Sequence, residues 1–262
     1  MRLIRYLILP LLVCLIACQQ QPSSPDTLTI GTIAGPESDL VRAAKTVAHD
    51  QYHLNIRVVE FSDYNLPNAA LNDGSLDANV YQHLPYLQAS VNAHHYAIEP
   101  IGRTFLFPAG LYSQKVTSLD ALPDRARIAI PNDPSNEARA LRLLAKFKLI
   151  TLNDSSTPSV QDITENPKKL RIKTLDAAQL PRILPDVDAA VINTTFAIPA
   201  GLNPLRDALV SESQDSPYAN LVVIQKHTKK RAQLEHFVEA LHSDDVKAKA
   251  QELFGNAAII AW

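Results

Sequence analysis

Cysteine is almost absent from this 262-residue sequence, in which it occurs only as Cys14 and Cys18. Because both lie near the N-terminus, the rest of the chain has no disulfide bond, no cysteine metal site and no cysteine nucleophile. Glycine is scarce as well, with seven residues, whereas proline occurs 18 times and indicates stiffened loops. Thiol chemistry is therefore excluded from everything that follows the N-terminal segment.

An excess of charge of one sign is also lacking. Lys and Arg total 25 and Asp and Glu total 27, so nothing indicates a nucleic-acid partner. The common catalytic motifs are missing too, since the chain has no Gly-x-Ser-x-Gly, His-Glu-x-x-His, P-loop or Gly-x-Gly-x-x-Gly pattern. We therefore expect no metal and no cofactor. A lipid-anchored hydrolase that depends on His83 remains an alternative, because catalytic triads assemble from distant residues.

The N-terminal segment has the pattern of an export signal. Residues 1–17 combine Arg2 and Arg5 with an apolar run that is too short to span a bilayer comfortably. The run Leu15-Ile16-Ala17-Cys18 resembles the bacterial lipobox, which implies cleavage before Cys18 and lipid on its sulfur and amino group. An ordinary signal peptide with an incidental cysteine is the alternative. Residues 18–26 are polar and rich in proline and serine, and we expect them to form a flexible tether.

The remainder of the chain alternates between strand and helix patterns, which predicts an α/β fold. The first set of elements comprises strands at 27–33, 55–61 and 76–81, helices at 38–50, 67–72 and 84–92, and extended chain at 98–112. The second set comprises strands at 127–130, 170–175 and 189–193, a helix at 134–147 and short helices at 118–122 and 177–184. A late strand at 221–225 and helices at 234–241 and 246–254 close the chain.

Two sets of α/β elements with a late return predict two lobes. We expect residues 27–112 to form the first part of lobe 1, 113–215 to form lobe 2 and 216–262 to return to lobe 1. Ligands of open α/β sheets bind at the carboxyl ends of the strands. Those ends carry the polar groups of 81–83, 132–136 and 193–194, so a cleft between the lobes would face all three.

One stretch, residues 130–144, combines a strand with the start of a helix. Asn132 or Asp133 is placed to cap that helix, and Pro134 suits its first turn. Asn136 and Arg139 are three residues apart and share one helical face, where Arg offers a planar fork for a carboxylate. A capped surface helix with a solvated arginine is the alternative interpretation.

Other polar and aromatic residues suit an amino-acid ligand but have structural alternatives. Asn193 follows a buried strand, although it is also placed to cap a helix. Asn220 precedes the late strand and is equally typical of a turn. Tyr64, Tyr81 and Phe105 suit the walls of an apolar slot, and the two tyrosines are equally typical of the core. His83 suits either a helix cap or a binding site.

Several segments resemble the NlpA/MetQ family of methionine-binding lipoproteins. The resemblance is carried by residues 61–87 (FSDYNLPNAALNDGSLDANVYQHLPYL), 130–144, 166–169, 180–182, 186–194 and 216–220. It implies a two-lobe periplasmic-binding-protein fold in a monomer that is held at the cell envelope by a lipid on Cys18. It also implies delivery of L-methionine to an ABC importer made of a membrane permease and an ATPase, without enzymatic activity.

The resemblance further implies a ligand site. In the implied site, Arg139 binds the carboxylate, asparagines hold the polar end of the ligand, and aromatic residues and histidine enclose the thioether. By position, the contacts fall on Tyr64, Tyr81, His83, Asn136, Arg139, Asn193 and Asn220. The same residues leave three alternatives open: D-methionine, a methionine-containing dipeptide or another small amino acid as ligand. A surface-exposed interaction lipoprotein with a vestigial cleft is a further alternative.

Overall fold

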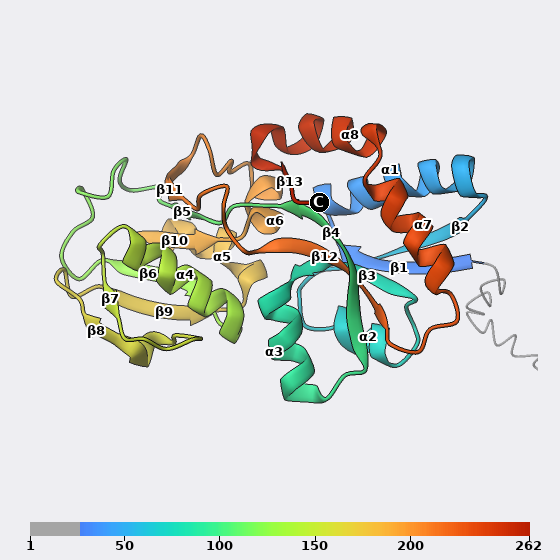
Figure 1. Ribbon diagram of the computed structural model, residues 1–262. Coiled ribbons are helices and arrows are strands. Elements are labelled where there is room, and N and C mark those ends of the chain that lie inside the picture. Colours follow the sequence, from blue (N-terminus) through green and yellow to red (C-terminus); the bar gives the residue numbers. More distant parts are fainter. Residues whose placement is uncertain (1–26) are drawn as a thin grey trace, which may run out of the picture.

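The structure, a computed structural model, describes residues 27–262 and contains two main β-sheets with helices on both faces (Figure 1). The predicted signal segment 1–17, the tether 18–26 and Cys18 lie outside the described residues. Within 27–262, no helix combines the length and apolar character needed to cross a membrane. The predicted α/β fold class is confirmed.

The larger sheet has six strands in the order β13-β4-β12-β3-β1-β2. Strand β1 lies parallel to β2 and β3, whereas β12 lies antiparallel to β3 and β4. The strands are β1 (Thr27–Ile33), β2 (Asn55–Phe61), β3 (Ala78–His83), β4 (Ile98–Leu106), β12 (Ala219–Gln225) and β13 (Ile259–Ile260).

Alternate residues of β12 pack into different cores on the two faces of this sheet, as expected for a strand buried on both sides. Val222 and Ile224 join the core under α1 (Pro36–Tyr52), α7 (Arg231–Leu241) and α8 (Asp244–Phe254). Leu221 and Val223 join the core under α2 (Pro67–Asn72) and α3 (Leu84–His94). The two groups of helices lie above and below the sheet in Figure 1.

The smaller main sheet has five strands in the order β11-β5-β10-β6-β9. These are β5 (Gly110–Tyr112), β6 (Arg127–Pro131), β9 (Arg171–Leu175), β10 (Ala189–Ile192) and β11 (Ala208–Ser211). Helix α4 (Pro134–Lys146) covers one face with Leu141 and Leu144, and α5 (Leu180–Ile183) contributes Leu180 to the core on the other. Strands β7 (Thr151–Leu152) and β8 (Ile163–Glu165) form a separate pair, and α6 (Thr194–Ala197) follows β10.

The chain crosses between the sheets earlier than the expected boundary at residue 112. Gly110–Tyr112, which we expected in lobe 1, pairs with β10 and β11 in the five-stranded sheet. The extended stretch breaks at Pro108, which has no N–H with which to continue a ladder. Sheet membership therefore favours a first crossing at 107–109 and a return at 212–218 as the limits of the proposed lobes.

Short elements account for the other differences from the predicted elements. Residues 118–122 form a turn rather than a helix, because so short a segment followed by Pro123 cannot complete the costly first turn. The segment 177–184 contains a 3₁₀ turn (Ala177–Gln179), α5 and a second 3₁₀ turn (Leu184–Asp186) instead of one helix. Pro181 and Pro185 remove backbone donors there.

Candidate functional site

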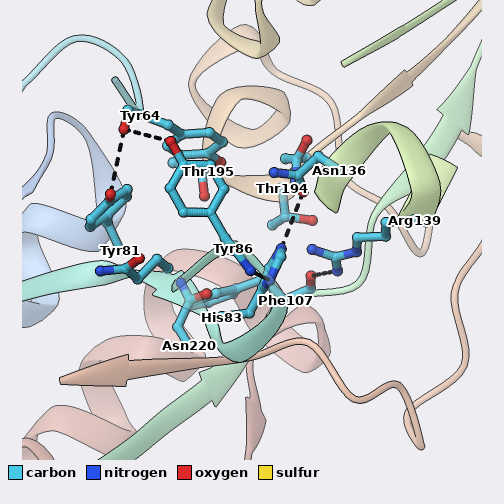
Figure 2. Close-up of a pocket in the computed structure, with 12 residues that line it drawn as sticks. Tyr64, Tyr81, His83, Tyr86, Phe107, Asn136, Arg139, Thr194, Thr195 and Asn220 are labelled. Carbon is cyan, nitrogen blue, oxygen red and sulfur yellow. Dashed lines mark hydrogen bonds between the residues drawn. The ribbon is translucent and has the colours of Figure 1, made fainter. Parts of the chain in front are cut away.

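The structure brings all seven predicted site residues together around one cavity of about 330 Å³ (Figure 2). They come from the loop after β2 (Tyr64), from β3 (Tyr81, His83), from α4 (Asn136, Arg139), from the end of β10 (Asn193) and from β12 (Asn220). The cavity is completed by Gln82, Tyr86, Phe107, Thr194 and Thr195. All seven predicted side chains are buried. Both sheets therefore contribute to one enclosed site, although its use for ligand binding stays a prediction.

The start of α4 sets the position of Asn136. Asp133, one of the two predicted caps, accepts a hydrogen bond from the backbone N–H of Asn136 at 2.9 Å. The same carboxylate accepts Nδ2 of Asn136 at 3.1 and 2.9 Å, and the hydroxyl of Ser135 at 2.9 Å. Burial raises the pKa of Asp133, and these donors oppose the rise. The cap thus orders the side chain as well as the backbone at this helix end.

The contact between Asp133 and Asn136 determines which atoms of the neighbouring side chains donate hydrogen bonds and which accept them. Since Nδ2 of Asn136 faces a carboxylate, its Oδ1 faces the other way and accepts from Nε2 of His83 at 3.2 Å and from Nδ2 of Asn193 at 2.8 Å. Nδ1 of His83 accepts the N–H of Tyr86 at 3.2 Å, so His83 also caps α3. Burial, with the Arg139 charge adding to it, lowers the pKa of His83 to about 3. The imidazole is therefore neutral at pH 7 and carries its proton on Nε2.

The structure also decides between the roles considered for two asparagines, a helix cap for Asn193 and a turn for Asn220. Asn193 stands at the N-cap position of α6 but makes no capping bond, because its side chain is directed to Asn136. Asn220 is not a turn residue, since it lies within β12 in register with His83. Each asparagine therefore presents a side chain to the cavity from a strand or strand end.

Arg139 differs from the prediction in its partner. Its Nε donates to Oε1 of Glu212 at 2.8 Å and its Nη2 donates to Oε2 at 2.5 Å, so the fork predicted to hold a ligand carboxylate holds Glu212. Nη2 also donates to the carbonyl oxygen of Phe107 at 2.9 Å, and the guanidinium lies 4.4 Å from the centre of the Tyr218 ring. A guanidinium has five N–H groups, and within residues 27–262 the two on Nη1 have no hydrogen-bond partner.

Glu212 and Glu37 are site residues that the sequence analysis missed. Glu37 lies in the first turn of α1, where an acidic residue is ordinarily a surface group that favours the helix dipole. It is only 6% exposed, and its Oε1 accepts from Oγ1 of Thr195 at 2.8 Å and from Nδ2 of Asn220 at 3.2 Å. Burial raises its pKa to about 7. No sequence pattern signals either contact, because the partners lie far along the chain.

The apolar wall of the cavity consists mainly of tyrosines. The ring of Tyr64 lies 5.8 Å from that of Tyr81, 5.9 Å from that of Tyr86 and 4.9 Å from that of Phe196. The hydroxyl of Tyr86 donates to the carbonyl oxygen of Tyr64 at 2.8 Å, as Figure 2 shows. These contacts hold the rings as a rigid surface against which a small apolar group can pack.

The prediction that Phe105 lines this wall is wrong, and Phe107 takes the place instead. Side chains two residues apart on a strand share a face, so Phe105 lies one repeat deeper along β4. There it packs against Trp262 and against Phe107 itself. The aromatic residue that reaches the cavity is therefore the one just beyond the end of the strand.

Comparisons with known proteins agree with this architecture. A family model described as NlpA lipoprotein matches residues 28–262. The D-methionine-binding lipoprotein MetQ of Escherichia coli K12 is 42% identical over 252 residues, which cover 95% of this chain and 93% of the relative. A periplasmic substrate-binding protein of an ABC transporter from Coxiella burnetii is 53% identical with a TM-score of 0.87, over 89% of this chain and 100% of that one. A nutrient-binding protein from Burkholderia cenocepacia, solved with methionine, is 45% identical with a TM-score of 0.87, over 90% and 100%. The predicted two-lobe architecture is thereby confirmed.

Proposed function

This chain belongs to the NlpA lipoprotein family, and from that membership we propose that it captures L-methionine between its lobes and delivers it to an ABC importer. The observation that carries this proposal is the cavity itself. Its walls place a buried arginine, paired asparagines and a tyrosine cluster around about 330 Å³. These groups match the needs of a free amino acid, which requires donors for its carboxylate, acceptors for its ammonium and an apolar wall for its side chain.

Each part of methionine has a matching group in the cavity. The carboxylate is assigned to Nη1 of Arg139, where a charged hydrogen bond contributes about 1.5–3 kcal/mol. The ammonium is assigned to the amide oxygens of Asn193 and Asn220. The thioether is assigned to the tyrosine wall, where contacts between sulfur and an aromatic ring add about 0.3–1.5 kcal/mol.

The burial of these residues suits tight binding of a small ligand. Methionine has about nine heavy atoms, and the best small ligands gain about 1.5 kcal/mol per atom, for a limit of about 13 kcal/mol. Nanomolar affinity requires about 12.3 kcal/mol. Such affinity therefore requires nearly every ligand atom to be in contact, which the enclosed walls favour.

The hydrogen bonds made by the polar side chains of the site favour ligand binding over hydrolysis. Both ring nitrogens of His83 are engaged, one by a backbone N–H and the other by Asn136. The nearby hydroxyls of Thr194 and Thr195 donate to the carbonyl oxygen of Pro108 and to Glu37. His83 therefore has no free nitrogen to activate a hydroxyl or a water, and we propose that the chain is not an enzyme.

The remaining elements of the proposal concern location and partners. We propose that lipid on Cys18 anchors a monomer at the cell envelope, and that the loaded protein docks on a permease coupled to an ATPase. The lipoproteins among its relatives support an envelope location.

The test begins with the small molecule that accompanies the protein. The full chain is purified in detergent and denatured, and the released ligand is identified by mass spectrometry. The emptied protein is then titrated calorimetrically with L-methionine, D-methionine, glycyl-methionine and other amino acids. Sub-micromolar binding of L-methionine, weakened at least 100-fold by Arg139→Ala and by Asn220→Ala, is expected. Tighter binding of D-methionine or of the dipeptide would change the assigned ligand, and no binding of any would refute the proposal.

A further inference from the structure

Glu37 is a buried charged group that the ligand assignment above does not use. It reaches the back of the cavity wall from α1, and its Oε1 accepts from residues of both lobes, namely Thr195 at 2.8 Å and Asn220 at 3.2 Å. Within residues 27–262, its second oxygen, Oε2, has no hydrogen-bond partner. A second cavity of about 280 Å³ is lined by Glu37 and shares Asn220 and Phe107 with the main one. A carboxylate placed so close to a ligand site affects the charge that the site accepts.

We propose that Glu37 is a positioning residue that makes the site specific for ligands with a free α-ammonium group. The inference rests on the proposed function, because it assumes an amino acid in the cavity. A carboxylate only accepts hydrogen bonds, so it holds the Nδ2 side of Asn220 toward itself and leaves the Oδ1 side of that amide for the ligand.

On the opposite side of the cavity, the amide of Asn193 is oriented by a carboxylate in a similar way. There Asp133 holds Nδ2 of Asn136, whose oxygen holds Nδ2 of Asn193, so the Asn193 amide also keeps its oxygen for the ligand. Two amide oxygens are thus fixed by two carboxylates from opposite sides. An ammonium group has three donors and no acceptor, so it fits two oxygens, whereas a hydroxyl or a methyl group does not use both.

The charges in the wall support the same assignment. The positive charge of Arg139 is already paired with Glu212, with both side chains under 10% exposed. Glu37 has no cationic partner among the described residues and receives only two neutral donors. Burial of an unpaired charge is costly, and the rise in the pKa of Glu37 to about 7 reflects that cost. A ligand ammonium would supply the missing positive charge.

The test compares methionine with 4-(methylthio)butanoate, which is methionine without its amino group. Calorimetric titrations use the full chain and the variant Glu37→Gln, which keeps the size of the side chain and removes its charge. The matched control is Glu235→Gln, an exposed glutamate on α7. We expect Glu37→Gln to weaken methionine binding at least tenfold and to leave the affinity for the des-amino analogue within a factor of two, while the control changes neither.

The outcomes separate this inference from the proposed function. An equal loss for both ligands would show a structural role, and unchanged selectivity would show no role, so either result overturns the inference while the proposed function stands. Failure of the wild-type chain to bind methionine overturns both.

A measurement on the wild-type chain covers the case in which the variant does not fold. Methionine binding at pH 7, measured in buffers of different ionisation enthalpy, should release about half a proton, whereas the analogue should release none. Besides Glu37, the charged or titratable groups of this region are Arg139, His83, Asp133 and the three tyrosines Tyr64, Tyr81 and Tyr86. Burial lowers the pKa of His83 to about 3 and raises the pKa values of Tyr64, Tyr81 and Tyr86, so these groups stay neutral near pH 7, and Arg139, whose pKa is raised beside Glu212, stays charged. Equal proton release for the two ligands would overturn the inference.

Discussion

Replacing Glu37 by glutamine has a consequence for stability that is separate from ligand binding. The carboxyl has a pKa of about 7 in the folded chain against an ordinary value of 4.5. The folded state therefore holds this proton more tightly than the unfolded state does. The contribution of this group to stability is fully present below pH 4.5, falls as the pH rises toward 7, and is lost above that.

The size of the effect follows from the difference between the two pKa values. Each pKa unit corresponds to about 1.36 kcal/mol, so ionisation of Glu37 costs about 3 kcal/mol of folding free energy at pH 8. Glutamine mimics the protonated acid at every pH. Relative to their difference at pH 4.5, the variant should therefore gain about 3 kcal/mol on the wild type at pH 8, or about 6–12 °C in Tm.

Thermal unfolding of both full chains, followed by circular dichroism at half-unit steps from pH 4.5 to 8, measures this difference. The difference between the two melting temperatures isolates Glu37, because all other titrating groups are common to both chains. Curves that run parallel across this range would refute the reasoning, since they would mean that Glu37 titrates alike in the folded and unfolded chain. Exposed Glu235→Gln, measured in the same way, serves as the matched control for the removal of a carboxyl group.

Three further predictions concern other parts of the site and the core. Arg139→Ala should lower the free energy of unfolding in urea by about 3–5 kcal/mol, because it leaves Glu212 buried without a partner. Adding Glu212→Gln should restore most of that stability without restoring methionine binding. Equal stability of the single and double variants would contradict this. His83 should keep its Nε2 proton and stay neutral down to about pH 4 in ¹⁵N NMR spectra, because burial lowers its pKa to about 3; protonation near pH 6.5 would show that the imidazole is not buried as the structure places it. Gly102→Ala should destabilise the fold by about 1–3 kcal/mol, since the new Cβ would lie 2.6 Å from Cγ1 of Val238; an unchanged unfolding midpoint would contradict that packing.

The sequence predicted the regular elements well where their pattern is long or their ends are marked. The bounds of β1, β2 and α2 match the prediction, because alternation, Pro67 and the Asn72-Asp73-Gly74 turn define them locally. The polar groups at 81–83, 132–136 and 193–194 were expected at one cleft because parallel strands bring their carboxyl ends to one edge of a sheet, whereas the full set of seven site residues was implied by the resemblance to the NlpA/MetQ family. The short edge strands β11 and β13, with four and two residues, carry too little pattern to be found.

The charges that organise the site could not be predicted in the same way. Arg139 and Glu212 are separated by 73 residues, and Glu37 and Asn220 by 183. No periodicity links such positions, since a pairing across that distance depends on how whole sheets are packed. The sequence therefore indicated which groups line the cavity but not which groups hold them in place.

The pairing of Arg139 with Glu212 also determines when the arginine side chain loses its conformational freedom. It does so when the chain folds rather than when a ligand binds. A free arginine side chain carries about 2 kcal/mol of rotamer entropy, which must be given up before it can hold anything in one geometry. Here Glu212 and the carbonyl oxygen of Phe107 immobilise the guanidinium as the chain folds. The small ligand proposed for this site would then meet a cation that is already ordered, so more of its contact energy would be left to appear as affinity.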